Sequence, residues 1–115
     1  MNAPQTIIAK TSAVEVVQLP EKLVMANSDN AHKQLQSLID QGANRLVIDL
    51  STMQFMDSSG LAVLVGAWKK VKNEDGKVIL VSPSPSIRAL LELTRLHEIF
   101  EIFEDLDAAR ADALA

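Results

Sequence analysis

Cysteine is absent from this chain of 115 residues, and its two histidines, His32 and His97, lie far apart. The sequence therefore offers no disulfide, no thiol nucleophile and no cysteine-based metal site, and the histidines lack the spacing of metal ligands. Only four glycines are present, and they are scattered, so there is no glycine-rich phosphate loop. These absences argue against several classes of enzyme, and we expect neither a cofactor nor a bound metal.

Long apolar runs and an excess of basic charge are also missing. The longest apolar run, residues 61–68, is far too short to span a bilayer. The N-terminus has no basic start followed by a long apolar run, so no signal peptide is predicted. The formal net charge of −4 argues against nucleic-acid binding, which needs a concentrated basic surface. We therefore expect a cytoplasmic protein that binds neither nucleic acid nor a membrane.

The pattern of apolar residues predicts one α/β domain that spans residues 1–115. Segments rich in branched apolar residues predict strands at residues 6–10, 14–19, 45–50, 77–81 and 99–103. Helical spacing predicts helices from Asn27 or Ser28 to Gly42, from about Ser59 to Asn73, and over residues 84–94 and 105–113. This alternation predicts a mostly parallel sheet of four or five strands with an antiparallel edge, flanked by about four helices.

The most informative motif is Asp57-Ser58-Ser59-Gly60, which lies between two apolar stretches. Small hydroxyls with an acidic neighbour are typical of helix N-caps, and Ser59 is the favoured cap. The same hydroxyls would be exposed where the helix begins, so a charge added to one would alter the local surface. Asp57 either caps the helix or orients the Ser58 hydroxyl. Gly60 provides either close approach of another backbone or plain flexibility.

The helix after this motif carries small apolar residues on more than one face. Its predicted core stripe consists of Leu61, Leu64, Val65, Trp68 and Val71. The additional apolar positions are Ala62, Val63, Gly66 and Ala67. A lone surface helix should carry charge on that second face. Either another helix of the domain covers the second face, or it forms a partner-binding patch continuous with Ser58.

The sequence resembles the bacterial anti-sigma factor antagonists, which are single STAS domains. The resemblance is carried by residues 47–50, 55–61, 78–81 and 99–100. The resemblance covers about residues 6–110 and is most specific over residues 56–61. It implies that Ser58 is phosphorylated by a serine kinase that doubles as the anti-sigma factor. The unphosphorylated protein would bind this kinase and release its sigma factor. Phosphorylation would break the complex, and a metal-dependent serine phosphatase would reset it.

One loop departs from the family pattern. Many members carry Gly-Glu-Leu-Asp after the second strand, whereas this chain has Glu21-Lys22-Leu23-Val24. The resemblance places this loop beside the phosphoserine loop, as part of the partner surface, so the departure bears on partner identity. The predicted partner-binding residues are Asp57, Ser58, Ser59, Gly60, Ala62, Val63, Gly66, Glu21, Met25 and Asn27.

We therefore interpret the chain as a regulator, a monomer or weak dimer, whose protein binding is gated by phosphorylation of Ser58. No histidine is placed near Ser58 to form a nucleophile and base pair, so the chain is not predicted to be an enzyme. The usual output would be transcription, and the resemblance also allows secretion, motility or biofilm formation. The alternative is a STAS scaffold subunit of a larger signalling or transport assembly, without a phosphorylation switch. Ligand or nucleotide sensing has no dedicated residues.

Overall fold

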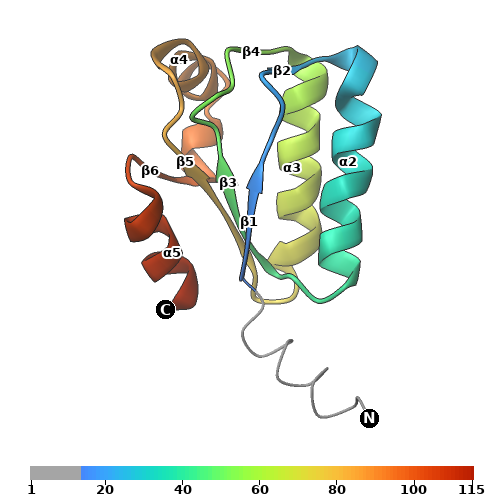
Figure 1. Ribbon diagram of the computed structural model, residues 1–115, viewed down its shortest axis with the longest axis vertical. Helices are drawn as coiled ribbons and strands as arrows, with labels where there is room; N and C mark the ends of the chain where they lie inside the picture. The colour runs from blue at the N-terminus through green and yellow to red at the C-terminus, as the bar shows by residue number, and fades with distance from the viewer. Residues whose placement is uncertain (1–13) are drawn as a thin grey trace.

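Four parallel strands form the central sheet of the computed structural model, which describes residues 14–115 (Figure 1). Their spatial order is β1-β3-β5-β6. These strands are β1 (Val14–Gln18), β3 (Arg45–Asp49), β5 (Lys77–Val81) and β6 (Glu101–Phe103). Parallel neighbours need crossover connections, which the intervening helices supply. The predicted α/β fold is confirmed. The predicted strand at residues 6–10, the turn after it and their antiparallel edge lie outside the described residues.

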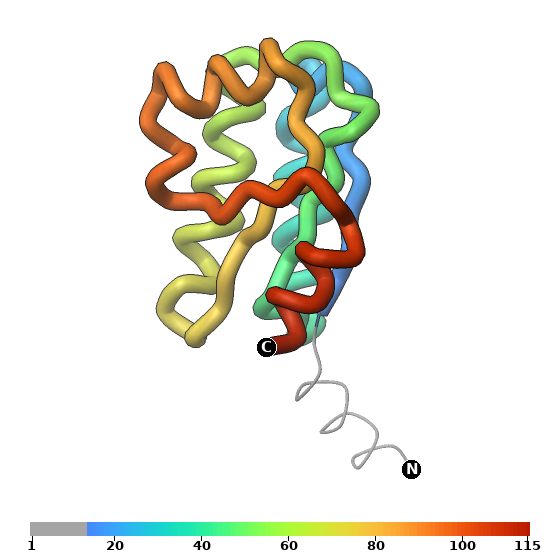
Figure 2. The backbone as a smooth tube through the Cα atoms, turned by 90° about the vertical axis from the view of Figure 1, so that its left-hand side faces the viewer, coloured from blue at the N-terminus to red at the C-terminus, as the bar shows by residue number. Residues whose placement is uncertain are grey.

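Helices cover both faces of this sheet. They are α2 (Met25–Asp40), α3 (Ser58–Lys72), α4 (Pro85–Leu93) and α5 (Leu106–Leu114), with a short 3₁₀ helix η1 (Leu96–Glu98). Residues of α2, α3 and α4 contribute to the larger core on one face, whereas among the helices of residues 14–115 α5 packs on the other. Figure 2, viewed from the α5 side, shows this helix in front of the strands. Within residues 14–115, no helix combines the length and the apolar character that crossing a membrane requires.

Strand β3 is buried on both faces, as its continuous apolar run predicts. Leu46 and Ile48 join the larger core, and Val47 packs with the alanines of α5. All three side chains are 0% exposed.

The last strand is shorter than the prediction from residue 99. The amides of Ile99 and Phe100 both donate to the carbonyl oxygen of Leu96, at 3.0 Å. These bonds extend the turn of η1, so pairing with β5 begins only at Glu101.

Charged groups fasten α5 to the sheet. Lys77 Nζ lies 3.2 Å from Asp112 Oδ2 and 3.3 Å from Glu101 Oε1, and Arg45 Nη1 donates to the carbonyl oxygen of Ala113 at 2.7 Å. The hydrogen bond to Asp112 raises the pKa of the Lys77 ammonium above its ordinary 10.5, against the opposing effect of desolvation. Because the folded pKa exceeds the unfolded one, this stabilisation is complete below pH 10.5 and is lost as the pH rises through the folded pKa.

We predict that Lys77→Met lowers the free energy of unfolding at about pH 8, by less than about 1 kcal/mol because the side chain is partly exposed. The difference from wild type should begin to shrink at about pH 11, because the stabilisation falls as the pH rises above the ordinary pKa of 10.5 towards the raised folded pKa. Urea unfolding at both pH values measures it. Lys33→Met removes an exposed pair with Asp29 (3.1 Å) and is the control, with an expected effect near zero. A Lys77→Met effect that is as large at the higher pH would contradict this account.

Candidate functional site

Two short strands outside the main sheet carry the approach to Ser58. Strand β2 (Lys22–Leu23) pairs in parallel with β4 (Phe55–Met56), which sets Lys22 opposite Phe55 and Leu23 opposite Met56. Leu23 and Met56 are buried, so Lys22 and Phe55 face solvent, as alternation along a strand requires. The sequence did not predict this sheet, because two residues are too few to display a strand pattern.

Backbone hydrogen bonds join the loop of residues 21–24, whose sequence differs from the family pattern, to the Ser58 motif. The amide of Gln54 donates to the carbonyl oxygen of Glu21 at 2.7 Å, and the amide of Asp57 donates to that of Leu23 at 3.2 Å. The loop after β1 therefore lies directly beside residues 57–60, at the end of the molecule where α2 and α3 begin (Figure 1).

Asp57 caps two helices at once. Its Oδ1 accepts hydrogen bonds from the amides of Ser59 (2.8 Å) and Gly60 (3.3 Å) at the start of α3. Its Oδ2 accepts from the amide of Met25, the first residue of α2, at 3.2 Å. A carboxylate in this position satisfies free amides and interacts favourably with both helix dipoles. The prediction that Ser59 is the cap is wrong, since Asp57 fills that position.

Ser58 is the first residue of α3, and its side chain is exposed. The Asp57 carboxylate takes backbone amides as its partners, and the Ser58 hydroxyl is not among them. Of the two roles left open for Asp57, the structure therefore shows capping. Ser59 is half-buried and lines a shallow groove of about 400 Å³ between α2 and α3. Of the two serines, Ser58 is the more accessible.

Gly60 lets the first turn of α3 lie against the β2–β4 pair. A Cβ atom at this position would come within 2.5 Å of Met56 Cγ and 2.8 Å of the carbonyl oxygen of Leu23. The second contact is with backbone, which cannot move without breaking the sheet. Of the two roles open for Gly60, the structure therefore supports close approach of another backbone.

We predict that Gly60→Ala lowers the free energy of unfolding by about 1–3 kcal/mol, because the added methyl group overpacks this contact. Chemical denaturation measures the loss. Gly66→Ala is the matched control on the same helix, since a Cβ there meets only the His32 ring, at 3.8 Å. It should be neutral or stabilise the helix by up to about 1 kcal/mol. Equal effects of the two substitutions would rule out the close approach as the reason for glycine at position 60.

The matches to known proteins cover almost the whole chain, and residues 5–109 fit the family model of the STAS domain. The chain belongs to the STAS domain family. The anti-sigma F factor antagonist of Paenibacillus polymyxa is 30% identical to this STAS domain over 93 residues, which are 80% of each chain. The family resemblance read from the sequence is thereby confirmed.

Solved structures share the fold of this STAS domain. The crystal structure of an anti-sigma factor antagonist from Mycobacterium paratuberculosis has a TM-score of 0.79 at 28% identity, over 88% of this chain and 86% of that one. The structures of SpoIIAA in its unphosphorylated and phosphorylated forms have TM-scores of 0.70 and 0.69 at 22% identity. They cover 88% of this chain, and 88% and 92% of the SpoIIAA chains. At that identity the likeness shows the fold alone.

The second face of α3 is largely closed in this STAS domain. Val63 is 5% exposed and Ala67 is 0% exposed, and both belong to the larger core, where α2 packs beside α3. Gly66 faces the ring of His32 on α2. The prediction of an exposed patch is therefore wrong at Val63 and Ala67, because a second helix of the domain covers them. Ala62 remains exposed.

The Asn27 side chain stabilises the loop of residues 21–24. Its Oδ1 accepts from the amide of Val24 at 2.9 Å, and its Nδ2 donates to the carbonyl oxygen of Lys22 at 2.8 Å. The side chain thus fixes the loop from inside the first turn of α2, as the inner member of a capping box does. The prediction that α2 begins after a cap at Asn27 or Ser28 is wrong, since the helix begins at Met25.

Phe55 is a surface residue that the sequence analysis missed. Its side chain is 52% exposed, although the neighbouring Met56 is buried. Met25, which was predicted to bind a partner, is 77% exposed. No local signal could have found Phe55, because the two residues of β4 are too few to display a strand period.

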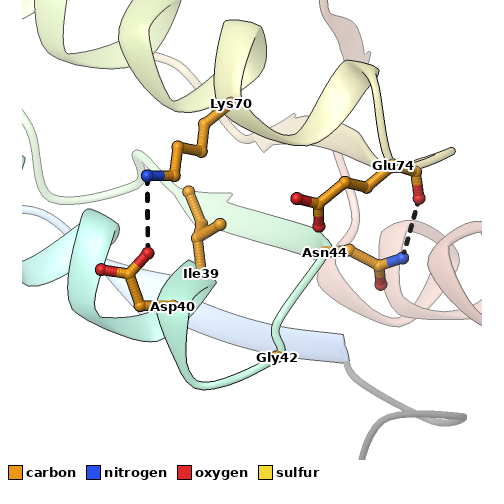
Figure 3. Close-up of a pocket in the computed structure, with 6 residues that line it drawn as sticks. All are labelled: Ile39, Asp40, Gly42, Asn44, Lys70 and Glu74. Atoms are coloured by element: carbon orange, nitrogen blue, oxygen red, sulfur yellow. Dashed lines mark hydrogen bonds and ion pairs between the residues drawn. The ribbon is translucent and has the colours of Figure 1, made fainter.

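A polar hollow of about 360 Å³ lies at the opposite end of α2 and α3 (Figure 3). Lys70 Nζ and Asp40 Oδ1 are 3.5 Å apart across it, and Asn44 Nδ2 donates to the carbonyl oxygen of Glu74 at 3.4 Å. Ser58 is about 18 Å away along the axis of α3. Lys70 and Asp40 are paired with each other. Within residues 14–115 no three His, Asp or Glu side chains gather as a metal site would require.

Proposed function

We propose that this STAS domain is an anti-sigma factor antagonist that works by partner switching at Ser58. In the unphosphorylated form it binds a serine kinase that is also the anti-sigma factor. Phosphorylation of Ser58 releases it, and a metal-dependent serine phosphatase returns it to the binding form. The observation that carries the proposal is the exposed Ser58 at the start of α3, next to a loop that backbone hydrogen bonds join to residues 54–57. Relatives named anti-sigma factor antagonists support it.

In this scheme the chain is a substrate and not an enzyme. Ser58 Oγ attacks the γ-phosphorus of ATP held by the kinase, an O–P bond forms, and the bond to the leaving ADP oxygen breaks. The serine proton passes to a base on the kinase. The phosphatase uses water to cleave the same ester and releases inorganic phosphate. The whole cycle takes place in the cytoplasm, without nucleic acid or membrane as a partner.

The position of Ser58 explains how a phosphate could change binding without unfolding the domain. A phosphoserine carries about −1.5 to −2 charges at neutral pH. The N-terminus of α3 tolerates an anion in the free protein. In a complex, the same phosphate would have to be desolvated, which is costly for an unpaired charge. The modification therefore acts mainly on the bound state.

The test is intact-mass and peptide mass spectrometry of the protein isolated from its native cell, before and after phosphatase treatment. We expect a phosphate on Ser58 that the phosphatase removes. Complete coverage of the Ser58 peptide without phosphate under any growth condition would sink the proposal. A stable co-purifying assembly in that case would support the scaffold alternative.

A further inference from the structure

Helix α5 is held on the sheet by small apolar contacts. Its two buried residues are alanines, Ala109 and Ala113, and Leu106 at its start is only partly buried. The helices on the other face bury larger side chains, among them Leu35 of α2 and Leu64 of α3. Because the hydrophobic contribution grows with the apolar area that is buried, α5 is bound to the sheet more weakly than α2 or α3. A weakly packed helix opens at a lower free energy than the fold as a whole.

The sheet surface beneath α5 is complementary to this helix in both shape and charge. We call it the α5-binding face, and it consists of Arg45, Val47, Lys77, Ile79 and Val81. Its three apolar side chains are at most 1% exposed. At its polar end Lys77 pairs with Asp112, and Arg45 donates to the carbonyl oxygen of Ala113. An open face loses all of these contacts, and α5 of a second copy restores all of them.

The link between β6 and α5 lies where the helix can reach a neighbour. Strand β6 is at one edge of the main sheet, so no other strand of residues 14–115 pairs with its outer side. Helix α5 begins beside this edge, because Phe103 and Leu106 pack against the same small core. The link is Glu104 and Asp105. The carbonyl oxygen of Glu104 accepts from Ser82 Oγ at 2.6 Å, whereas Asp105 is exposed and extended. A rotation at Asp105 therefore redirects α5 and leaves β6 in place.

We propose that two copies of this STAS domain form a dimer by exchanging α5, so that each helix occupies the α5-binding face of the other copy. With the two β6 edges adjacent, the two helix starts lie close together and a short link is long enough. Such a dimer is weak, because its helix contacts are the same as those of the monomer. Ser58 begins α3, which packs on the other face of the sheet, so the exchange leaves it accessible. The inference is independent of the proposed function.

Reversed charges can force the exchange. Lys77→Glu places a carboxylate opposite Asp112 and beside Glu101, and Asp112→Lys places an ammonium opposite Lys77. Each variant therefore repels its own α5, and a homodimer of either variant has the same repulsion. In an exchanged dimer with one copy of each, the Asp112→Lys helix meets the Lys77→Glu face, and the two unchanged residues meet each other. Both contacts then join opposite charges, so only the exchanged heterodimer is favoured.

The experiment mixes the two purified variants in equal amounts and measures mass by native mass spectrometry and light scattering. We expect the mixture to contain at least about ten times the dimer fraction of either variant alone. Amides of α5, exposed to hydrogen exchange in each variant, should regain protection in the heterodimer. A chain that carries both substitutions restores the pair within one copy and should be as monomeric as wild type. Lys33→Glu mixed with Asp29→Lys reverses an exposed pair on α2 and should not dimerise.

A mixture that stays monomeric would overturn the inference. An equal dimer fraction with the α2 pair would overturn it too, because any reversed pair would then be enough. So would a heterodimer in which α5 stays unprotected, since the copies would then associate through another surface. Hydrogen exchange of wild type decides the matter if a variant does not fold. Amides of α5 should exchange at least about tenfold faster than those of α3, and equal protection would contradict the opening. Neither result depends on phosphate at Ser58, so each proposal can fail alone.

Discussion

Ser58→Asp is expected to weaken binding of the STAS domain to the proposed kinase at least about 100-fold, or roughly 2.7 kcal/mol. The substitution places a negative charge at the first position of α3, next to the Asp57 cap. An interface that buries this position must desolvate the charge. Aspartate carries one charge, fewer than a phosphoserine, so its effect is a lower bound on that of the phosphate.

Binding is measured by quantitative pull-down of the kinase with wild type, Ser58→Ala and Ser58→Asp. Ser58→Ala should bind at least as well as wild type, because it cannot be phosphorylated and released. Gln34→Glu adds the same charge on the exposed outer face of α2 and should bind normally. Undiminished binding of Ser58→Asp would contradict an electrostatic switch at this position. The free Ser58→Asp protein should unfold within about 0.5 kcal/mol of wild type, since anions are tolerated at helix N-termini.

Local patterns predicted the main sheet well. The continuous apolar runs of β3 and β5 indicate strands buried on both faces, and the intervening helical periodicity indicates crossovers. The β2–β4 pair was not predictable in the same way. Each strand has two residues, and its stability depends on a partner from a distant part of the chain. Periodicity likewise groups Val63 and Ala67 on one face of α3, but it does not say that α2 covers that face.

The sequence predicts that the Ser58 motif begins a helix, but it does not predict which of its residues is the helix cap. Sequence spacing shows that Asp57, Ser58 and Ser59 stand at a helix start, where each could be the cap. Asp57 is the cap because its Oδ1 accepts hydrogen bonds from the amides of Ser59 and Gly60. Its Oδ2 also accepts from the amide of Met25, 32 positions away. No local signal reports such a bond. The same bond helps to explain why the loop of residues 21–24 and the Ser58 motif lie side by side.

Asp57→Ala is expected to lower the free energy of unfolding by about 1–4 kcal/mol, because it removes a cap from two helices and each cap contributes roughly 0.5–2 kcal/mol. The amides of Met25, Ser59 and Gly60 would lose their acceptor together. Asp57→Asn should cost about half as much, because the amide group keeps one acceptor oxygen but turns a donor towards the other helix. Urea unfolding gives the energies, and hydrogen exchange shows whether both helix starts lose protection.

Asp105→Ala is the matched control, because Asp105 caps only α5, through the amide of Asp107 at 3.3 Å. It should cost about 1 kcal/mol. If Asp57→Ala costs no more than Asp105→Ala, or if only the start of α3 loses protection, the bond to Met25 does not couple the two helices. If both starts open, the loop that carries Met25 also loses its position beside Ser58. Binding of the proposed partner should then weaken, because Met25 is one of the predicted partner-binding residues. Asp57 would thus position the partner surface as well as stabilise the fold.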